Sequence, residues 1–507
     1  MKFSELTRLE KIGVRDVTGV ADADFSDACY DSRLVHSGAL FVAIRGANAD
    51  GHKFIGKAIE QGAMGIVLED ETALSEEEAE RAKILRIVVE DSRIALAHIS
   101  EQLFGNPSKS LRLIGVTGTN GKTTVTNLIK QLLEARGEKV GLIGTIGIMI
   151  GDDNIPATHT TPESREISEL LRRMVDAEVT TCVMEVSSHA LALGRVAALE
   201  FDIAIFTNLT QDHLDFHKSM EAYLAAKRLL FTSLDYTSVA ITNADDPSGE
   251  FVLGSTNANV HSYGILEGPN EREQADLIAS EITLSPSKTS FKIRKRYSDE
   301  ACEIDTALIG RFNIENILAA VSGLYFGVEG CSLEVLAAAM KIAKPVRGRF
   351  EAIALTNGAT AIIDYAHTPD ALERVLATIQ ELHGDSNGRI VTVFGCGGDR
   401  DRTKRPIMGR IATEHSDQVI ITNDNPRSER PEEIAREIEH GIEPSLLHRS
   451  RRILDRQEAI FQALEESQRG DTILIAGKGH EDYQIIGAQR LHFDDREVVL
   501  DWARTQG

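Results

Sequence analysis

Cysteine, long apolar runs and positive charge are all scarce in this sequence. Its 507 residues include five cysteines, widely spaced and without a C-x-x-C pair: Cys29, Cys182, Cys302, Cys331 and Cys396. This spacing argues against a disulfide framework or a zinc knuckle and is typical of the reduced cytosol. The longest apolar stretch, residues 142–150, is far shorter than the ~20 residues that span a bilayer. Residues 1–13 have no apolar core of a secretory signal, so we expect a cytoplasmic protein.

The charge balance excludes two classes of partner. Lysine and arginine total 55 against 78 aspartate and glutamate residues, which gives a net charge of −23 at pH 7. A field of this sign repels nucleic acid and anionic membrane surfaces, so we expect neither as a partner. An anionic substrate would have to be held by local basic groups. The chain is long enough for about three domains at ~150 residues each.

Strand-like apolar segments alternate with helical segments, which predicts an α/β fold with parallel sheets. The strands expected in the middle of the chain are residues 111–116, 140–145, 181–186, 202–208 and 238–242. Further strands are expected at residues 40–44, 65–68 and 84–88, and at 361–365, 390–394, 418–422 and 472–476. We place the domains at residues 1–110, 111–343 and 344–507. Residues 255–300 are polar and read as poor in strands, which favours a small subdomain or an insertion.

A glycine-rich loop between a strand and a helix predicts a phosphate-binding site. Glycines let the backbone N–H groups of such a loop face a phosphate chain, and the helix N-terminus adds positive potential. Lys122 can reach the β- and γ-phosphates and Thr123 can ligate Mg²⁺. Val116 stands at the first glycine position of the general pattern, and the alternative is an ordinary glycine-rich turn. The predicted ATP-binding residues are Gly118, Thr119, Asn120, Gly121, Lys122, Thr123 and Thr124.

Polar side chains follow three strands of the same group. Glu185 ends one strand, His213 follows the next, and residues 243–246 follow the third. Because ligands lie beyond the carboxyl ends of parallel strands, we expect Glu185 and His213 beside Thr123 as Mg²⁺ ligands. A single histidine taken alone is more often a hydrogen-bonded structural residue. Its place among His189, His217 and His367, near acidic groups, favours the functional interpretation.

A series of motifs, in order along nearly the whole chain, resembles that of the Mur ligases: residues 117–124, 184–189, 207–215, 223–227, 310–316 and 364–369. The resemblance implies three domains, with a central P-loop-type ATPase domain on a parallel sheet, a Rossmann-like C-terminal domain and a smaller N-terminal α/β domain. It implies a cytoplasmic peptidoglycan-precursor enzyme that joins amino acids to a UDP-linked muramoyl peptide. ATP would be consumed through an acyl phosphate, and we expect a monomer.

The resemblance also implies roles for residues outside the loop. Lys227 would be carbamylated by CO₂ and hold a second Mg²⁺, whereas without the family it reads as a snorkelling lysine on an amphipathic helix. Asn313 or Asn316 would contact the adenine, Arg349 the phosphates, and Asp364 the nucleotide side of the cleft. The residues expected to carry the reaction are Lys122, Lys227, Glu185 and His213.

Three loops at strand ends in the last third of the chain predict a second pocket. They bring two arginines, a carboxamide and two carboxylates, which suit a zwitterion because arginine pairs bidentately with a carboxylate. Residues 424–427 resemble the motif of family members that add meso-diaminopimelate, and Arg427 would face that substrate's extra carboxylate. The alternative is a plain Asx-Pro turn. The expected pocket residues are Arg400, Asp424, Asn425, Pro426, Arg427, Gly477 and Glu481.

The first domain resembles the uridine-nucleotide domain of the same subgroup, with Ser32 and the loop 46–49 at the uridine and diphosphate. The resemblance implies these contacts to the UDP-linked muramoyl dipeptide: Tyr30, Ser32, Thr160, Thr161, Ser188, Arg195 and the carbamylated Lys227. Residues 190–194 lack a glutamine found in some members, which affects the sugar contact. The rival interpretations are a lysine-adding or folate-extending ligase, which would lack Arg427 or the first domain, and an ATP-driven switch that forms no bond.

Overall fold

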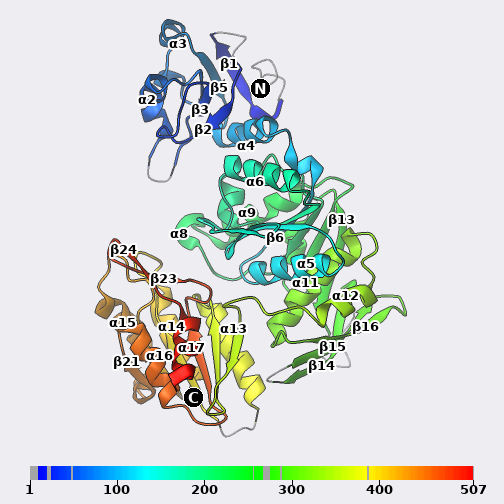
Figure 1. The fold of residues 1–507 in the computed structure, drawn as a ribbon, viewed down its shortest axis with the longest axis vertical. Coiled ribbons are helices and arrows are strands. Elements are labelled where there is room, and N and C mark those ends of the chain that lie inside the picture. The colour runs from blue at the N-terminus through cyan, green and yellow to red at the C-terminus, as the bar shows by residue number, and fades with distance from the viewer. Residues whose placement is uncertain are drawn as a thin grey trace.

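In the computed structural model the described residues form three large sheets, which follow one another along the long axis of the molecule (Figure 1), and a two-stranded sheet. The structure describes residues 10–19, 24–46, 49–254, 256–266, 275–285, 288–384 and 388–505. Most of the segment examined for a secretory signal therefore lies outside the described residues, as do positions 47 and 48 of the predicted uridine loop. No helix of the described part of the chain is both long and apolar enough to cross a membrane.

The N-terminal sheet has five strands in the order β1-β5-β4-β3-β2. Their bounds are β1 Val14–Thr18, β2 Asp27–Cys29, β3 Ala39–Val42, β4 Gly65–Leu68 and β5 Leu85–Val89. The helices of this region include α2 Ile55–Glu60, α3 Glu76–Ala82 and α4 Ser92–Leu103. Strands β3, β4 and β5 are buried along their length because apolar clusters pack on both faces of the sheet.

The central sheet has eleven strands in the order β16-β15-β14-β13-β12-β11-β6-β10-β7-β8-β9. Its first eight strands are β6 Arg112–Thr117, β7 Val140–Gly144, β8 Gly147–Ile150, β9 Asp153–Ile155, β10 Thr181–Glu185, β11 Ile203–Phe206, β12 Val239–Asn243 and β13 Asn259–Ile265. Strands β10 and β11 run parallel to β6 on either side, with Glu185 opposite Val116 and Phe206 opposite Thr117. This register brings the polar residues after the three strands to one edge.

Helices cover both faces of the central sheet. Their bounds are α5 Lys122–Glu134, α6 Ser164–Asp176, α7 Ser188–Ala192, α8 Leu214–His217, α9 Met220–Thr232, α10 Gly249–Leu253, α11 Arg311–Gly327 and α12 Leu333–Met340. Helices α5, α11 and α12 contribute to one apolar core, and α6 and α9 to the other. Strand β6 is buried between these two layers, which fixes the start of the loop that follows it.

The expectation that residues 255–300 are poor in strands is wrong. Strands β13, β14 Leu277–Ser285, β15 Lys288–Lys295 and β16 Ala301–Thr306 extend the central sheet. The last three pair antiparallel, and in β15 Phe291 and Ile293 point into the core while their neighbours are more exposed. Because every second residue of such a strand is polar, the segment resembles a loop in composition. The strands described within it continue the central sheet.

The C-terminal sheet has the order β17-β18-β22-β19-β20-β21. The strands are β17 Glu351–Ala354, β18 Thr360–Asp364, β19 Ile390–Phe394, β20 Gln418–Ile421, β21 Ser450–Arg452 and β22 Thr472–Ala476. The helices are α13 Pro369–His383, α14 Lys404–His415, α15 Pro431–Glu439, α16 Arg456–Glu465 and α17 Asp495–Thr505. A hairpin of β23 Tyr483–Ile486 and β24 Gln489–His492 forms a separate two-stranded sheet. All strands but β17 run parallel, so Asp364, Phe394 and Ala476 end level with one another.

Candidate active site

The glycine-rich loop joins β6 to α5 and is shaped by two glycines. Gly118 has φ +151° and Gly121 has φ +87°, and a Cβ would lie 1.8 Å from Thr207 Oγ1 at the first and 2.3 Å from Asn316 Oδ1 at the second. The loop is held from the neighbouring strand end, since Asn208 accepts hydrogen bonds from the backbone N–H groups of Thr119 and Asn120. The backbone therefore curls tightly at the N-terminus of α5, where an anion is favoured.

Two lysine amines converge on this loop. Lys122 Nζ donates to the carbonyl oxygens of Gly118 at 3.0 Å and Thr119 at 2.8 Å. Lys227 Nζ donates to Gly118 O at 2.7 Å, and its side chain is 1% exposed. The lysine on α9 is thus buried and does not snorkel. Burial, and then the charge of Lys122, hold the pKa of the Lys227 amine well below its usual value, which favours the neutral amine.

Thr123, Thr145 and Glu185 form an oxygen cluster beside the loop, in which Thr123 and Glu185 are buried. Thr123 Oγ1 and Thr145 Oγ1 each donate to Glu185 Oε2 at 3.0 Å, and the Thr145 N–H donates to Oε1 at 2.8 Å. Arg349, from the start of the C-terminal region, donates to Thr123 Oγ1 at 3.1 Å. A hydroxyl and a carboxylate are hard oxygen donors of the kind Mg²⁺ takes beside a nucleotide, so these residues fit that ion.

A cavity of about 240 Å³ lies over the loop. Thr124, Asn316, Arg349 and Asp364 all line it, together with the loop residues 118–123. Of the two candidate adenine contacts, Asn316 reaches this lining, whereas the Asn313 amide donates to Ile309 O at 2.8 Å and to none of the described residues of the cavity wall. Asp364 is fixed by the N–H groups of Phe350 and Ala366, both at 2.7 Å.

His213 lies at the junction of this cavity and a larger one. It has φ +53°, and its ring centroid is 4.7 Å from that of His189. Burial lowers the pKa of His213 to about 4, against the opposing charge of Asp212. The ring nitrogens of a neutral imidazole can accept a hydrogen bond or bind a metal. His213 precedes α8 and Glu185 ends β10, and both line the 240 Å³ cavity.

The residues assigned to the muramoyl dipeptide divide between two places. Thr160 and Ser188 line the cavity, and the Thr161 hydroxyl donates to Glu185 O at 2.8 Å. Arg195 pairs with Glu163 at 2.8 Å and donates to Thr161 O. Tyr30 and Ser32 belong to the N-terminal region and lie apart from the residues described as lining either cavity. Tyr30 instead donates to Glu166 of α6 at 3.0 Å.

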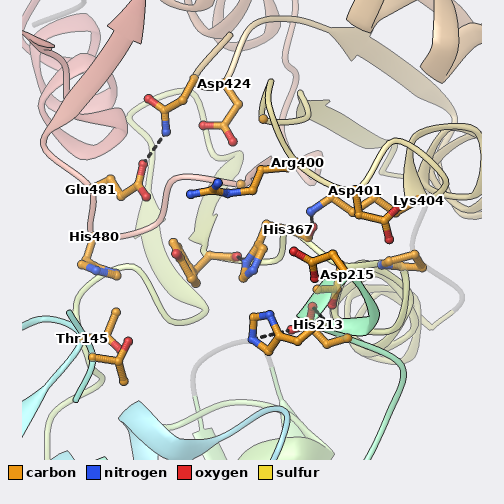
Figure 2. Close-up of a pocket in the computed structure, with 18 of the residues that line it drawn as sticks. Thr145, His213, Asp215, His367, Arg400, Asp401, Lys404, Asp424, His480 and Glu481 are labelled. Atoms are coloured by element: carbon orange, nitrogen blue, oxygen red, sulfur yellow. Dashed lines mark hydrogen bonds and ion pairs between the residues drawn. The ribbon is translucent and has the colours of Figure 1, made fainter. Parts of the chain in front are cut away.

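The three C-terminal loops do converge. A cavity of about 1260 Å³ is lined by Arg400, Asp424, Asn425, Arg427, Gly477 and Glu481. It shares Thr145, Thr160, Asp212, His213, Tyr365 and His367 with the smaller cavity, so the two cavities adjoin. Figure 2 shows Asp424, Glu481 and Arg400 on one side and Thr145 and His213 on the opposite side. Pro426 turns the chain, and its carbonyl would lie 1.9 Å from a Cβ at Gly398.

The acidic and basic groups of this pocket have different hydrogen-bond partners. Glu481 Oε2 accepts from Asn425 Nδ2 at 2.9 Å, and burial, then the charge of Asp424, raise the pKa of Glu481. Asp424 Oδ1 is buried and accepts no hydrogen bond from any described residue. Arg427 has φ +52° and donates to Gly398 O at 2.7 Å. The pocket therefore presents carboxylate oxygens and guanidinium groups together, as a zwitterionic ligand requires.

Three buried cationic side chains lie behind the pocket, and they were not identified from the sequence. Lys478, Arg405 and Arg456 are each at most 2% exposed. Arg405 pairs with Glu429 and donates to Gly397 O at 3.1 Å. Arg456 pairs with Asp495 and donates to the carbonyls of Asn423 and Ala476, at the ends of two pocket strands. Charged residues are almost never fully buried without partners, but the sequence does not reveal those partners.

Family models match the chain in three consecutive segments. They are described as Mur ligase family, catalytic domain, for residues 28–103, Mur ligase middle domain for 116–323, and Mur ligase, glutamate ligase domain, for 348–479. Together they include the glycine-rich loop, the oxygen cluster and most of the C-terminal pocket.

Individual relatives match over nearly the full length. A protein of Bacillus velezensis named UDP-N-acetylmuramoyl-L-alanyl-D-glutamate--2,6-diaminopimelate ligase is 43% identical over 485 residues, 94% of each chain. One of the same name from Syntrophomonas wolfei is 42% identical over 506 residues, 99% of each chain. A solved structure with that name is similar at a TM-score of 0.70 and 31% identity, and covers 100% of this chain and 99% of its own.

Proposed function

The chain belongs to the Mur ligase family, and from this premise we propose that it adds meso-2,6-diaminopimelate to the D-glutamate of UDP-N-acetylmuramoyl-L-alanyl-D-glutamate. It is an ATP-dependent ligase that forms an amide bond. We propose further that residues 1–110 bind the uridine nucleotide, 111–343 bind ATP and 344–507 bind the incoming amino acid, in a cytoplasmic monomer that contributes to peptidoglycan synthesis.

The first step is transfer of the γ-phosphoryl group to the D-glutamate side-chain carboxylate, which yields an acyl phosphate and ADP. Little acid–base chemistry is needed, so positioning and charge stabilisation dominate. Lys122 would leave the Gly118 and Thr119 carbonyls to meet the β- and γ-phosphates. Arg349 would help at the phosphates, while Asn316, with Asn313 behind it, would meet the adenine.

Thr123, Glu185 and His213 would hold Mg²⁺, and a carbamate on Lys227 would hold a second ion. Bound Mg²⁺ would neutralise charge on the transferring phosphoryl group. The burial of Lys227 and the lowered pKa of its amine support the modification, because a neutral amine can add to CO₂ and release one proton. The carbamate nitrogen would keep one N–H, which could still donate to Gly118 O.

The second step is attack of the diaminopimelate amine on the acyl phosphate, which releases phosphate through a tetrahedral intermediate. Arg427 and Arg400 would bind the distal carboxylate, and Asp424, with Glu481, the distal ammonium. Thr160, Thr161, Ser188 and Arg195 would hold the dipeptide between the two cavities, with Tyr30 and Ser32 on the nucleotide side. Closure of the cleft would exclude the water that competes with the amine.

One observation carries the choice of amino acid: Arg427 and the carboxylates Asp424 and Glu481 line one pocket that adjoins the nucleotide cavity. Phosphate release from ATP should be measured with the UDP-linked dipeptide and either meso-diaminopimelate or L-lysine. We expect release and a tripeptide product with diaminopimelate. Release with lysine alone would contradict the assignment of meso-diaminopimelate as the substrate. Release without any amine or peptide product would favour an ATP-driven switch that forms no bond.

A further inference from the structure

Lys478 is enclosed by the loops of the diaminopimelate pocket. Its side chain is 0% exposed. Nζ donates to Tyr483 O at 2.6 Å, to Asn425 Oδ1 at 3.2 Å and to Glu481 Oε2 at 3.2 Å, and lies 3.4 Å from Asp424 Oδ1. An ammonium has three N–H donors, so these oxygens use all of them.

Lys478 lies behind the pocket wall. Asp424, Asn425 and Glu481 are among the described residues that line the large cavity, and Lys478 is not. Because Asn425 Oδ1 accepts from Lys478 and from the N–H of Ile485, the amide must turn Nδ2 toward Glu481. Lys478 therefore fixes two lining side chains without touching a ligand itself.

The charges of Lys478 and its two carboxylate neighbours sum to minus one. When ionised, Asp424 and Glu481 carry two negative charges, and the Lys478 ammonium carries one positive charge. One net negative charge matches one ammonium group of a ligand that meets the lining residues Asp424 and Glu481, while the buried Asp424 Oδ1 lies 3.4 Å from Lys478 Nζ. Two carboxylates this close would otherwise disfavour ionisation of one of them.

We propose that Lys478 is a positioning residue that sets the charge of the ammonium subsite to one and orients Asn425 and Glu481 for the distal ammonium of the incoming amino acid. This inference rests on the proposed function, because it assigns that subsite to diaminopimelate. Lys478 acts through its neighbours and is not a catalytic residue.

The electrostatics of Glu481 give the inference a pH signature. Lys478 is a cause that lowers the pKa of Glu481, while burial and Asp424 raise it. Arg456 of α16, Tyr365 after β18 and Tyr483 of β23 also face Glu481. Without Lys478, the carboxyl pKa rises further, so Glu481 is protonated at a higher pH and binds an ammonium less well.

The test is the KM for diaminopimelate of Lys478→Met between pH 6 and 8.5. We expect a rise of about tenfold at pH 7, because a buried acceptor left without its charged donor costs about 1–3 kcal/mol, and a smaller rise at pH 8.5, with the KM for ATP unchanged. Arg86→Met is the matched control, because Arg86 is 3% exposed and pairs with Asp16 in the N-terminal sheet. It should leave the KM for diaminopimelate unchanged at every pH.

A pH-independent rise, or equal rises in both KM values, would overturn the inference and leave the ligase function intact. Failure of the wild type to use diaminopimelate would instead contradict the proposed function. If Lys478→Met is too unstable for kinetics, the free energy of unfolding in urea is measured instead. Adding Glu481→Gln should restore stability in the Lys478→Met background and not in the wild type, and equal effects in both backgrounds would contradict the inference.

Discussion

The nucleotide cavity and the diaminopimelate pocket occupy the same kind of place, beyond the carboxyl ends of parallel strands, but are built by different means. The nucleotide loop is one continuous stretch whose backbone is shaped by Gly118 and Gly121. The pocket takes side chains from three loops, which buried cations hold from behind. Backbone geometry suits a phosphate chain, whereas side-chain charge suits a zwitterion. Changes in one region should therefore spare the step carried by the other.

The largest effect is expected from Lys122→Ala. This change removes the ammonium that would meet the transferring phosphoryl group, and loss of one such group costs roughly 10²–10³-fold in rate. Phosphate release with all substrates present should fall at least that far. Near-normal turnover would contradict the role of the loop.

Arg427→Ala should raise the KM for diaminopimelate by roughly 10- to 100-fold, since a hydrogen bond to a charged group contributes about 1.5–3 kcal/mol. The KM for ATP should change little, because Arg427 contacts the pocket loops and is not among the described residues lining the nucleotide cavity. Initial rates with each substrate varied in turn check this. Equal losses for both substrates would indicate a folding defect.

Asn316→Ala should change the KM for ATP and not the KM for diaminopimelate, and the change should be smaller than that expected for Arg427→Ala. Loss of an adenine hydrogen bond of about 0.5–1.5 kcal/mol should raise the KM for ATP by roughly 2- to 12-fold. The KM for diaminopimelate should stay as it is. Asn313→Ala is the matched control on the same helix. A larger effect of Asn313→Ala on the KM for ATP would contradict the assignment of Asn316 as the adenine contact.

The smallest expected effects concern pH, and they differ in sign between Glu481 of the diaminopimelate pocket and His217, whose ring lies 2.9 Å from the hydroxyl of Ser188 at the nucleotide cavity. Burial lowers the pKa of His217 to about 4, so its contribution to stability is lost as pH falls from about 6.5 toward 4. The raised pKa of Glu481 makes its contribution full below about 4.5 and lost as pH rises through the folded pKa. Urea unfolding of His217→Gln should show a smaller loss of stability toward pH 5, on the order of 1 kcal/mol, and Glu481→Gln a smaller loss toward pH 8. The same slope in both variants would contradict the comparison.

The parts predicted from sequence are those whose signal is local. The strands at residues 390–394 and 472–476 have the expected bounds, because a buried parallel strand is a short, unbroken apolar run. Residues 255–300 were misread because the antiparallel strands there alternate polar and apolar residues. The choice between Asn313 and Asn316 depends on the rotation of α11, and the partners of Lys478 come from distant loops. Neither is encoded in spacing along the chain.

The most direct test of separate ATP and amine regions is trapping of the acyl phosphate with hydroxylamine in the absence of diaminopimelate. Wild type and Arg427→Ala should form the hydroxamate from ATP and the UDP-linked dipeptide at equal rates, while only the wild type incorporates diaminopimelate efficiently. Loss of hydroxamate formation in a folded Arg427→Ala variant would contradict the account, because the amine pocket would then be required for phosphoryl transfer.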